Sequence, residues 1–227
     1  MIQLFNINNY VIDTEKLGNH LHGKAVDELE KTVCEYVGAK HGCALGSATN
    51  AIFLAFENKD QIVTIPSILP SVVPNALLLG GNRLRFCDKV GWVGHSYTLH
   101  NFGDYKVIDS AQRLDRNQFK DADEDDLMIF SFYPTKPVGS IDGGMIVSND
   151  KSKIDYIRQR SMNGMTAAIN NWDRETVSHG WKMYMNSVQA FVALENLKKL
   201  DEKKKRLKVV RSFYNKKFGI ENTSNHL

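Results

Sequence analysis

The stretch Phe130-Ser131-Phe132-Tyr133-Pro134-Thr135-Lys136 is the most informative part of this sequence. It closes an apolar run that begins at Met128, and Gly139 and the turn Asp142-Gly143-Gly144 separate it from the next apolar run. A lysine on such a loop is ordinarily a solvated surface residue. Inside a pocket, however, desolvation lowers its pKa and makes it a nucleophilic amine. Because glycines permit tight backbone turns, the segment predicts a strand, a candidate catalytic loop carrying Lys136, and a second strand.

Short apolar runs alternate with helical patterns along the rest of the chain. The expected strands are Cys43–Leu45, Ile62–Ile65, Leu84–Cys87, Val107–Ile108, Met128–Phe132 and Met145–Val147. Apolar residues at helical spacing predict helices over Gly23–Gly38, Ala48–Glu57 and Ser71–Leu79, and one long helix or two over Asn186–Phe218. This alternation is typical of an α/β fold with a mostly parallel central sheet, in which ligands bind at the carboxyl ends of the strands.

A second candidate site segment, Gly46-Ser47-Ala48-Thr49-Asn50-Ala51, joins an expected strand to an expected helix. Its small residues let the backbone approach an anion, and the first N–H groups of the helix, with the Thr49 hydroxyl, can donate to it. An ordinary helix cap uses the same residue types. Taken alone, the segment is explained better by the cap.

A third segment, Val107-Ile108-Asp109-Ser110-Ala111-Gln112, places an acid directly after an apolar strand. A carboxylate at that position can pair with a protonated ring nitrogen and so make a pyridine ring a better electron sink. Gln112 is then in reach of a neighbouring ring oxygen. For Asp109 in isolation, an N-cap role accounts for the residue about equally well.

Composition restricts the class of protein without identifying it. With 42% hydrophobic and 24% charged residues in 227, the chain has the make-up of an ordinary globular protein. It has no apolar run of membrane-spanning length, and the N-terminal MIQLFNINNY does not follow the pattern of a signal peptide, which predicts a cytoplasmic protein without a membrane partner. The three cysteines, Cys34, Cys43 and Cys87, form no CxxC pair, which favours reduced thiols over a disulfide framework or a metal site.

The stretch Lys198–Lys217 holds ten Lys or Arg residues against two acids. Such a run can bind nucleic acid by neutralising phosphates. It also carries an apolar stripe: Leu200, Leu207, Val210, Phe213 and Tyr214. The stripe favours a packed helix with a solvated cationic face, so no nucleic-acid partner is expected.

In this order, the segments at 46–51, 108–112 and 130–136, with Gly143–Asp150 behind them, resemble the DegT/DnrJ family of pyridoxal-phosphate-dependent nucleotide-sugar aminotransferases. Pro66-Ser67 with Asn75-Ala76, and Met185 with Gln189-Ala190 and Leu197–Leu200, are also similar to that family. The resemblance implies the large domain of the aspartate-aminotransferase fold, pyridoxal 5'-phosphate as cofactor, and a homodimer.

The same resemblance implies a role for each candidate residue. Lys136 forms a Schiff base with the cofactor and then moves a proton, and Asp109 keeps the ring nitrogen protonated. The remaining cofactor contacts are Gln112 at the ring hydroxyl and Ala48, Thr49 and Ser131 at the phosphate. Because Lys136 is present, where the family's dehydratase branch has a histidine, the resemblance favours transamination of a keto-sugar nucleotide by a donor such as glutamate. Nucleotide-sugar and polysaccharide biosynthesis is the implied setting.

Two positions depart from the family pattern. Pro70 stands where an aromatic residue usually covers the cofactor ring; proline keeps apolar contact but loses aromatic stacking, and Trp92 or Tyr97 are candidate substitutes. Lys182 stands where an asparagine reaches the phosphate in the partner subunit, and a lysine can make a charge-assisted contact there. An exposed surface cation explains Lys182 equally well.

The chain is also shorter than the family pattern, between Asp88 and Tyr105 and again after the long helical segment. We therefore expect a truncated fold in three parts: an N-terminal segment (1–22), a cofactor-binding α/β domain (23–184), and a helical segment and tail (185–227) that lacks the family's small C-terminal domain. This departure keeps an alternative open, a catalytically reduced protein of the same fold that binds cofactor or a partner.

Overall fold

The computed structural model describes residues 10–88, 94–166 and 173–219 of the chain. The helices are α1 (Thr14–Leu17), α2 (Lys24–Val37), α3 (Ala48–Phe56), α4 (Val72–Leu79), α5 (Lys151–Ser161), α6 (Ser187–Leu197) and α7 (Leu200–Phe218), with a short 3-10 helix, η1 (Gln118–Asp121). The strands are β1 (His41–Leu45), β2 (Ile62–Pro66), β3 (Arg83–Cys87), β4 (Tyr97–Asn101), β5 (Lys106–Asp109), β6 (Leu127–Ser131) and β7 (Gly144–Ser148). Among the described residues, no helix has both the length and the apolar character needed to cross a bilayer.

The expected α/β class is confirmed, but the expectation of a mostly parallel central sheet is wrong. The five-stranded sheet has the order β1-β7-β6-β5-β4, and only its β5–β6 pairing is parallel. Strands β2 and β3 form a separate parallel pair. A parallel pair needs a long crossover connection, usually a helix. The loop from 132 to 143 contains none, so β7 returns antiparallel to β6.

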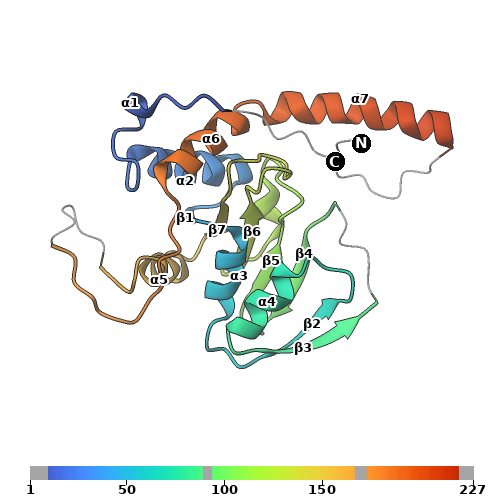
Figure 1. Cartoon of the computed structure of the whole chain (residues 1–227). Coiled ribbons are helices and arrows are strands. Elements are labelled where there is room, and N and C mark those ends of the chain that lie inside the picture. The colour runs from blue at the N-terminus through green and yellow to red at the C-terminus, as the bar shows by residue number, and fades with distance from the viewer. Residues whose placement is uncertain (1–9, 89–93, 167–172, 220–227) are drawn as a thin grey trace.

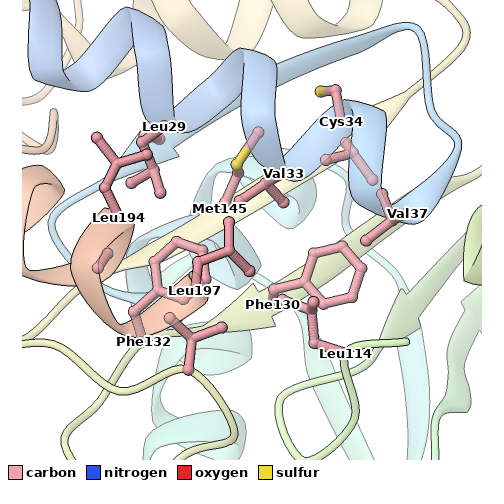
Figure 2. Close-up of a cluster of buried hydrophobic side chains, with 14 of the residues drawn as sticks. Leu29, Val33, Cys34, Val37, Leu114, Phe130, Phe132, Met145, Leu194 and Leu197 are labelled. Carbon is pink, nitrogen blue, oxygen red and sulfur yellow. The ribbon is translucent and has the colours of Figure 1, made fainter. Parts of the chain in front are cut away.

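Helices cover both faces of the central sheet and create two cores (Figure 1). Along β6 the side chains alternate between them, as a strand requires: Phe130 joins the core under α2 and α6, and Ile129 joins the core under α3, α4 and α5. Figure 2 shows the first core, in which Phe130 and Met145 of the sheet meet Val33 of α2. Strands β6 and β7 are buried along their whole length, which makes them a rigid support for the loop between them.

The expected strands and helices all occur, with ends shifted by a few residues at most. Four elements were not predicted: α1, β4, η1 and α5. Helix α5 has a weakly apolar sequence, KSKIDYIRQRS, and Asp150 caps its start by accepting from the N–H groups of Ser152 and Lys153. Trp92 and the tail after Glu221 lie outside the described residues.

The segment from Asn186 to Phe218 forms two helices, and the second one corrects the expectation of a packed helix. Asn186 and Gln189 make a reciprocal capping box at the start of α6, which packs beside α2. Helix α7 extends away from the body (Figure 1), and Leu200 is its one buried residue. The other stripe residues, Leu207, Val210, Phe213 and Tyr214, are between 43% and 59% exposed. Helical periodicity reveals an apolar face but not the surface that covers it.

A buried ion pair joins the end of α3 to α5, and further hydrogen bonds from both partners reach the segment after α5. Arg160 and Glu57 are 2% and 5% exposed and make two hydrogen bonds of 2.5 and 2.8 Å. Glu57 also accepts from Trp181 Nε1 at 2.9 Å, and Arg160 donates to the carbonyl of His179. Burial pushes the pKa of Glu57 up, but the hydrogen bonds from Arg160 and Trp181 hold it below its ordinary value. The network fixes the segment that carries Lys182.

Candidate active site

A cavity of about 520 Å³ opens where β5 and β6 end and α3 begins. Six of the seven candidate site residues line it: Ala48, Thr49, Asp109, Gln112, Ser131 and Lys136. These side chains come from three separate parts of the sequence, as the expectation of one ligand face at the strand ends requires. The volume lies within the range of small-molecule sites in proteins, roughly 300 to 1,000 Å³.

The loop that carries Lys136 is closed at its base and sharply turned. The N–H of Phe132 donates to Gly143 O at 2.8 Å, and the N–H of Ser140 donates to Phe132 O at 2.7 Å. Gly139 has φ +70°, and a Cβ added there would lie 2.8 Å from the carbonyl oxygen of Pro134. These contacts hold Lys136 half-buried in the cavity wall.

Burial lowers the pKa of the Lys136 amine, and the negative charge of Asp109 opposes part of that shift. The neutral, nucleophilic form of Lys136 is therefore present at lower pH than in an ordinary lysine. The opposing effect also shows that Lys136 and Asp109 interact electrostatically across the cavity.

We expect the reactivity of Lys136 toward an aldehyde to rise with pH around a midpoint below the ordinary lysine value of 10.5. In Asp109→Asn the midpoint is expected to move lower still, because the charge that favours the ammonium form is gone. The measurement is the rate of reductive methylation of Lys136 against pH, followed by mass spectrometry on the apoprotein. A midpoint at or above 10.5 in the unmodified sequence would contradict the expectation.

Asp109 is 5% exposed and held at both carboxylate oxygens. Oδ1 accepts from the N–H of Ala111, and Oδ2 accepts from the hydroxyl of Tyr97, both at 2.9 Å. Burial raises the pKa of Asp109, while the two hydrogen bonds and the charge of Lys136 pull it down. A cation placed in the cavity would stabilise the ionised carboxylate further.

Gln112 lies on a turn that side-chain hydrogen bonds hold in place. The Ser110 hydroxyl donates to Arg113 O at 2.7 Å, and the buried Gln118 amide donates to Ser110 Oγ at 2.5 Å. The side-chain oxygen of Gln112 accepts from the N–H of Gly94 at 2.7 Å. This contact leaves the NH₂ of Gln112 as the end that can donate to a ligand.

The start of α3 also lines the cavity, and its geometry suits an anion. Ser47 Oγ accepts from the N–H of Asn50 at 3.1 Å, so the capping role considered from the sequence is real. Helix geometry leaves the N–H groups of Ala48 and Thr49 without intrahelical acceptors, and both residues line the cavity. Gly144 packs directly beneath, since a Cβ there would lie 2.3 Å from Ala48 N. Ser47 thus caps the helix, and the N–H groups of Ala48 and Thr49 are left able to bind an anion.

Apolar residues and three rings, those of His95, Tyr97 and Tyr133, complete the walls. Pro70 lines the cavity at the position expected to cover a cofactor ring. Tyr97 also lines it and bonds Asp109, a role different from the stacking considered from the sequence. His95 is a lining residue that sequence reasoning missed. It belongs to a stretch without a recognisable strand or motif pattern, so no signal marked it.

Lys182 is the one candidate residue outside the cavity. It is exposed and pairs with Met162 in an isolated β-bridge. Its expected contact was with the cofactor phosphate in a partner subunit, so its place outside this cavity leaves that role untested.

The lining residues fit pyridoxal phosphate. The cavity combines an amine able to bond an aldehyde, a buried carboxylate able to face a ring nitrogen, and a helix N-terminus able to bind a phosphate. These are the parts that a cofactor of this kind needs from a protein.

Solved structures of sugar aminotransferases share this fold. The PLP form of the putative sugar aminotransferase Spr1654 from Streptococcus pneumoniae superposes with a TM-score of 0.76 at 17% identity, covering 94% of this chain and 70% of that one. Helicobacter pylori PseC, an aminotransferase involved in the biosynthesis of pseudaminic acid, gives a TM-score of 0.65 at 20% identity, covering 82% of this chain and 61% of that one. The chain therefore has the fold of the PLP-dependent sugar aminotransferases.

The sequence comparisons then give the family. The model for the DegT/DnrJ/EryC1/StrS aminotransferase family matches residues 5–79 and 116–225, and the chain belongs to that family. The UDP-4-amino-4,6-dideoxy-N-acetyl-beta-L-altrosamine transaminase of Campylobacter jejuni (strain 81-176) is 29% identical over 86% of this chain and 62% of its own length. The spore coat polysaccharide biosynthesis protein SpsC of Bacillus subtilis is 29% identical over 92% of this chain and 65% of its own length.

The matched part of this chain thus spans less than two thirds of the length of each of these two relatives. Asp109 and Gln112 lie between the two segments that match the family model, while Ala48, Ser131 and Lys136 lie inside them. Their joint placement around one cavity comes from the structure.

Proposed function

We propose that this chain binds pyridoxal 5'-phosphate and works as an aminotransferase that moves an amino group from an amino acid such as glutamate to a keto-sugar nucleotide. The observation that carries the proposal is the meeting of Lys136, Asp109 and the start of α3 around one cavity. Membership of the aminotransferase family supports the reaction class. The relatives named as UDP- and dTDP-linked sugar transaminases support the substrate class.

When bound, the cofactor supplies an aldehyde carbon that can carry an amino group and a ring that can delocalise negative charge. Lys136 would hold the cofactor at that carbon. The same amine would accept the proton from the α-carbon of the donor and return a proton to the sugar carbon that receives nitrogen. Asp109 would keep the ring nitrogen protonated by its charge, and the NH₂ of Gln112 would orient the ring.

The N–H groups of Ala48 and Thr49 would hold the phosphate, with the hydroxyls of Thr49 and Ser131 as further donors. The apolar wall formed by Ile52, Leu69, Pro70 and Val73 excludes water from one side of the cavity. A dry wall strengthens the electrostatic contacts of Asp109 and Lys136.

A homodimer is part of the proposal. Lys182 is exposed on a segment that the Glu57–Arg160 pair fixes in place, which suits a contact with the cofactor phosphate of a partner subunit. Sedimentation of a single monomeric species, unchanged by cofactor, would contradict it.

We place the protein in the cytoplasm. All three cysteines are free, two of them buried, which suits a reducing compartment. Recovery of the native protein from a periplasmic or secreted fraction would contradict this placement.

The first half-reaction, transfer of the amino group from the donor to the cofactor, tests the proposal. Protein saturated with pyridoxal phosphate is expected to show a visible absorbance band from the lysine-bound cofactor, and L-glutamate should convert it to the band of the aminated cofactor while 2-oxoglutarate accumulates. A keto-sugar nucleotide should then restore the first band. D-glutamate serves as the control.

An unchanged spectrum with every amino donor would reject the aminotransferase. If the cofactor nevertheless binds, that outcome favours the alternative of a catalytically reduced protein that binds cofactor or a partner.

A further inference from the structure

A second cavity lies against the first, on the far side of the Lys136 loop. It has a volume of about 350 Å³, and Gln112, Thr135 and Lys136 line both cavities. The second cavity is completed by the turn after β5 and by the first two turns of α7. The residues of α7 that line this second cavity have no role in the cofactor binding proposed above.

The lining of this second cavity carries an excess of positive charge. Apart from Lys136, three cations, Arg113, Lys203 and Lys204, face one carboxylate, that of Asp115. Arg113 Nε and Lys204 Nζ both bond Asp115, at 2.7 and 2.5 Å. Both carboxylate oxygens of Asp115 are therefore occupied by Arg113 and Lys204. Lys203 has no carboxylate partner among the described residues of the lining.

The Lys203 ammonium is nevertheless fixed in position. It donates to the carbonyl oxygens of Pro137 at 2.9 Å and Lys136 at 3.4 Å. An ammonium has three N–H donors, so one is left for a ligand in the cavity. Lys203 is an exposed residue, although desolvation beside the loop lowers the pKa of its ammonium.

The floor of the cavity is apolar. Leu114, Pro137, Leu200 and Leu207 line it, and Leu200 and Leu114 are buried beneath the surface. An apolar floor next to a cationic wall matches a ligand with a flat, weakly polar ring at one end and an anion at the other.

We propose that this second cavity binds the nucleoside diphosphate of the sugar substrate, with Lys203 as the main phosphate contact. The proposal rests on the proposed function, since it names the substrate subsite of the same reaction. A phosphate is favoured over the carboxylate of the amino donor, because proteins hold carboxylates best with the two-pronged fork of arginine, and the Nε of Arg113, one prong of that fork, already donates to Asp115. Lysine serves phosphate as a point charge.

The position of the cavity supports the assignment. A diphosphate at Lys203 lies just across the Lys136 loop from the cofactor cavity, so the sugar attached to it can extend toward the Lys136 amine. The shared wall residues Gln112 and Thr135 mark the passage between the two cavities.

The test is isothermal titration of the cofactor-loaded protein with UDP, inorganic pyrophosphate and L-glutamate in turn. Lys203→Met is expected to weaken UDP and pyrophosphate binding by about tenfold or more, because it removes a charge-assisted hydrogen bond. Lys203→Arg keeps the charge and is expected to stay within about threefold. Lys208→Met is the matched control, since Lys208 is an exposed lysine of α7 that does not line the cavity.

Equal UDP affinity in Lys203→Met and the unmodified protein would overturn the proposal, as would an equal loss in Lys208→Met. Dependence of L-glutamate binding, but not UDP binding, on Lys203 would also overturn it, as would the absence of UDP and pyrophosphate binding at millimolar concentration. Should Lys203→Met fail to fold, judged by circular dichroism, Lys203→Gln replaces it.

The absorbance change with L-glutamate is recorded on the same samples. If the absorbance change is absent while UDP binding depends on Lys203, the proposed reaction is wrong and the proposed second site is supported. If the absorbance change is present while UDP binding does not depend on Lys203, only the proposed second site is wrong.

Discussion

Lys136→Ala is expected to lose the covalent link to the cofactor and to lower aminotransferase activity by at least about a thousandfold, because one side chain supplies both the nucleophile and the acid–base group. No other lysine is among the described residues that line the cavity, so none of them can replace Lys136. Two measurements check the result: the visible absorbance of protein mixed with pyridoxal phosphate, and the steady-state rate with glutamate and a keto-sugar nucleotide. Borohydride treatment should fix cofactor to the unmodified protein at Lys136 and leave the variant unlabelled.

Two controls separate this role from general effects of charge. Lys205→Ala removes an exposed lysine of α7 that lines neither cavity and should leave activity and absorbance unchanged. Lys136→Arg retains a cation near Asp109 but offers no amine able to bond an aldehyde, so it should be as inactive as Lys136→Ala. Substantial turnover in either Lys136 variant would remove the residue from the mechanism.

The local parts of this site could be predicted from the sequence because each is encoded within a few residues. The strand, tight loop and lysine of residues 130–136 are contiguous, and so are the cap and first turn of α3. The acid after β5 is equally local. Since strand ends gather at one edge of a sheet, three local predictions were enough to place Lys136, Asp109 and Ala48 around one cavity.

Features that depend on distant parts of the chain could not be predicted in the same way. The direction of β7 follows from how the loop after Phe132 closes, and apolar composition does not encode direction. His95 and Tyr97 reach the cavity only because β4 pairs antiparallel to β5. The exposure of Phe213 and Tyr214 reflects what lies beside α7, which the periodicity of the helix does not specify.

The second cavity also depends on contacts between distant parts of the chain, so the sequence alone did not predict it. Lys203 belongs to a run of basic residues that from sequence alone suggests a solvated helix face. The first turns of α7 are tied to the body by Tyr36, whose hydroxyl donates to Asp201 Oδ1 at 2.6 Å, and by Lys204, which bonds Asp115. These ties place Lys203 beside the Lys136 loop, where its ammonium donates to the carbonyl oxygens of Lys136 and Pro137.

Asp109→Asn is expected to leave cofactor attachment intact and to slow the reaction by about a hundredfold to a thousandfold, the usual effect of removing one preorganised electrostatic contact. Asparagine has the shape of aspartate and can still accept from the Ala111 N–H, but it has no charge to hold a proton on the ring nitrogen. Pre-steady-state absorbance with L-glutamate measures the loss at the proton-transfer step. Tyr97→Phe is the graded comparison: it removes one hydrogen bond from a carboxylate that stays charged, so its effect should be about tenfold or less.

The thermal stability of the Asp109→Asn apoprotein shows whether a loss of activity comes from the chemistry or from damage to the fold. Folding raises the pKa of Asp109, so the folded apoprotein binds a proton more readily than the unfolded chain. The ionised carboxylate therefore costs stability above its ordinary pKa, a cost that disappears as the pH falls below that value. At neutral pH the Asp109→Asn apoprotein should melt no lower than the unmodified apoprotein, although its activity is greatly reduced. A lower melting temperature together with unchanged turnover would show that Asp109 supports the fold and takes no part in the chemistry.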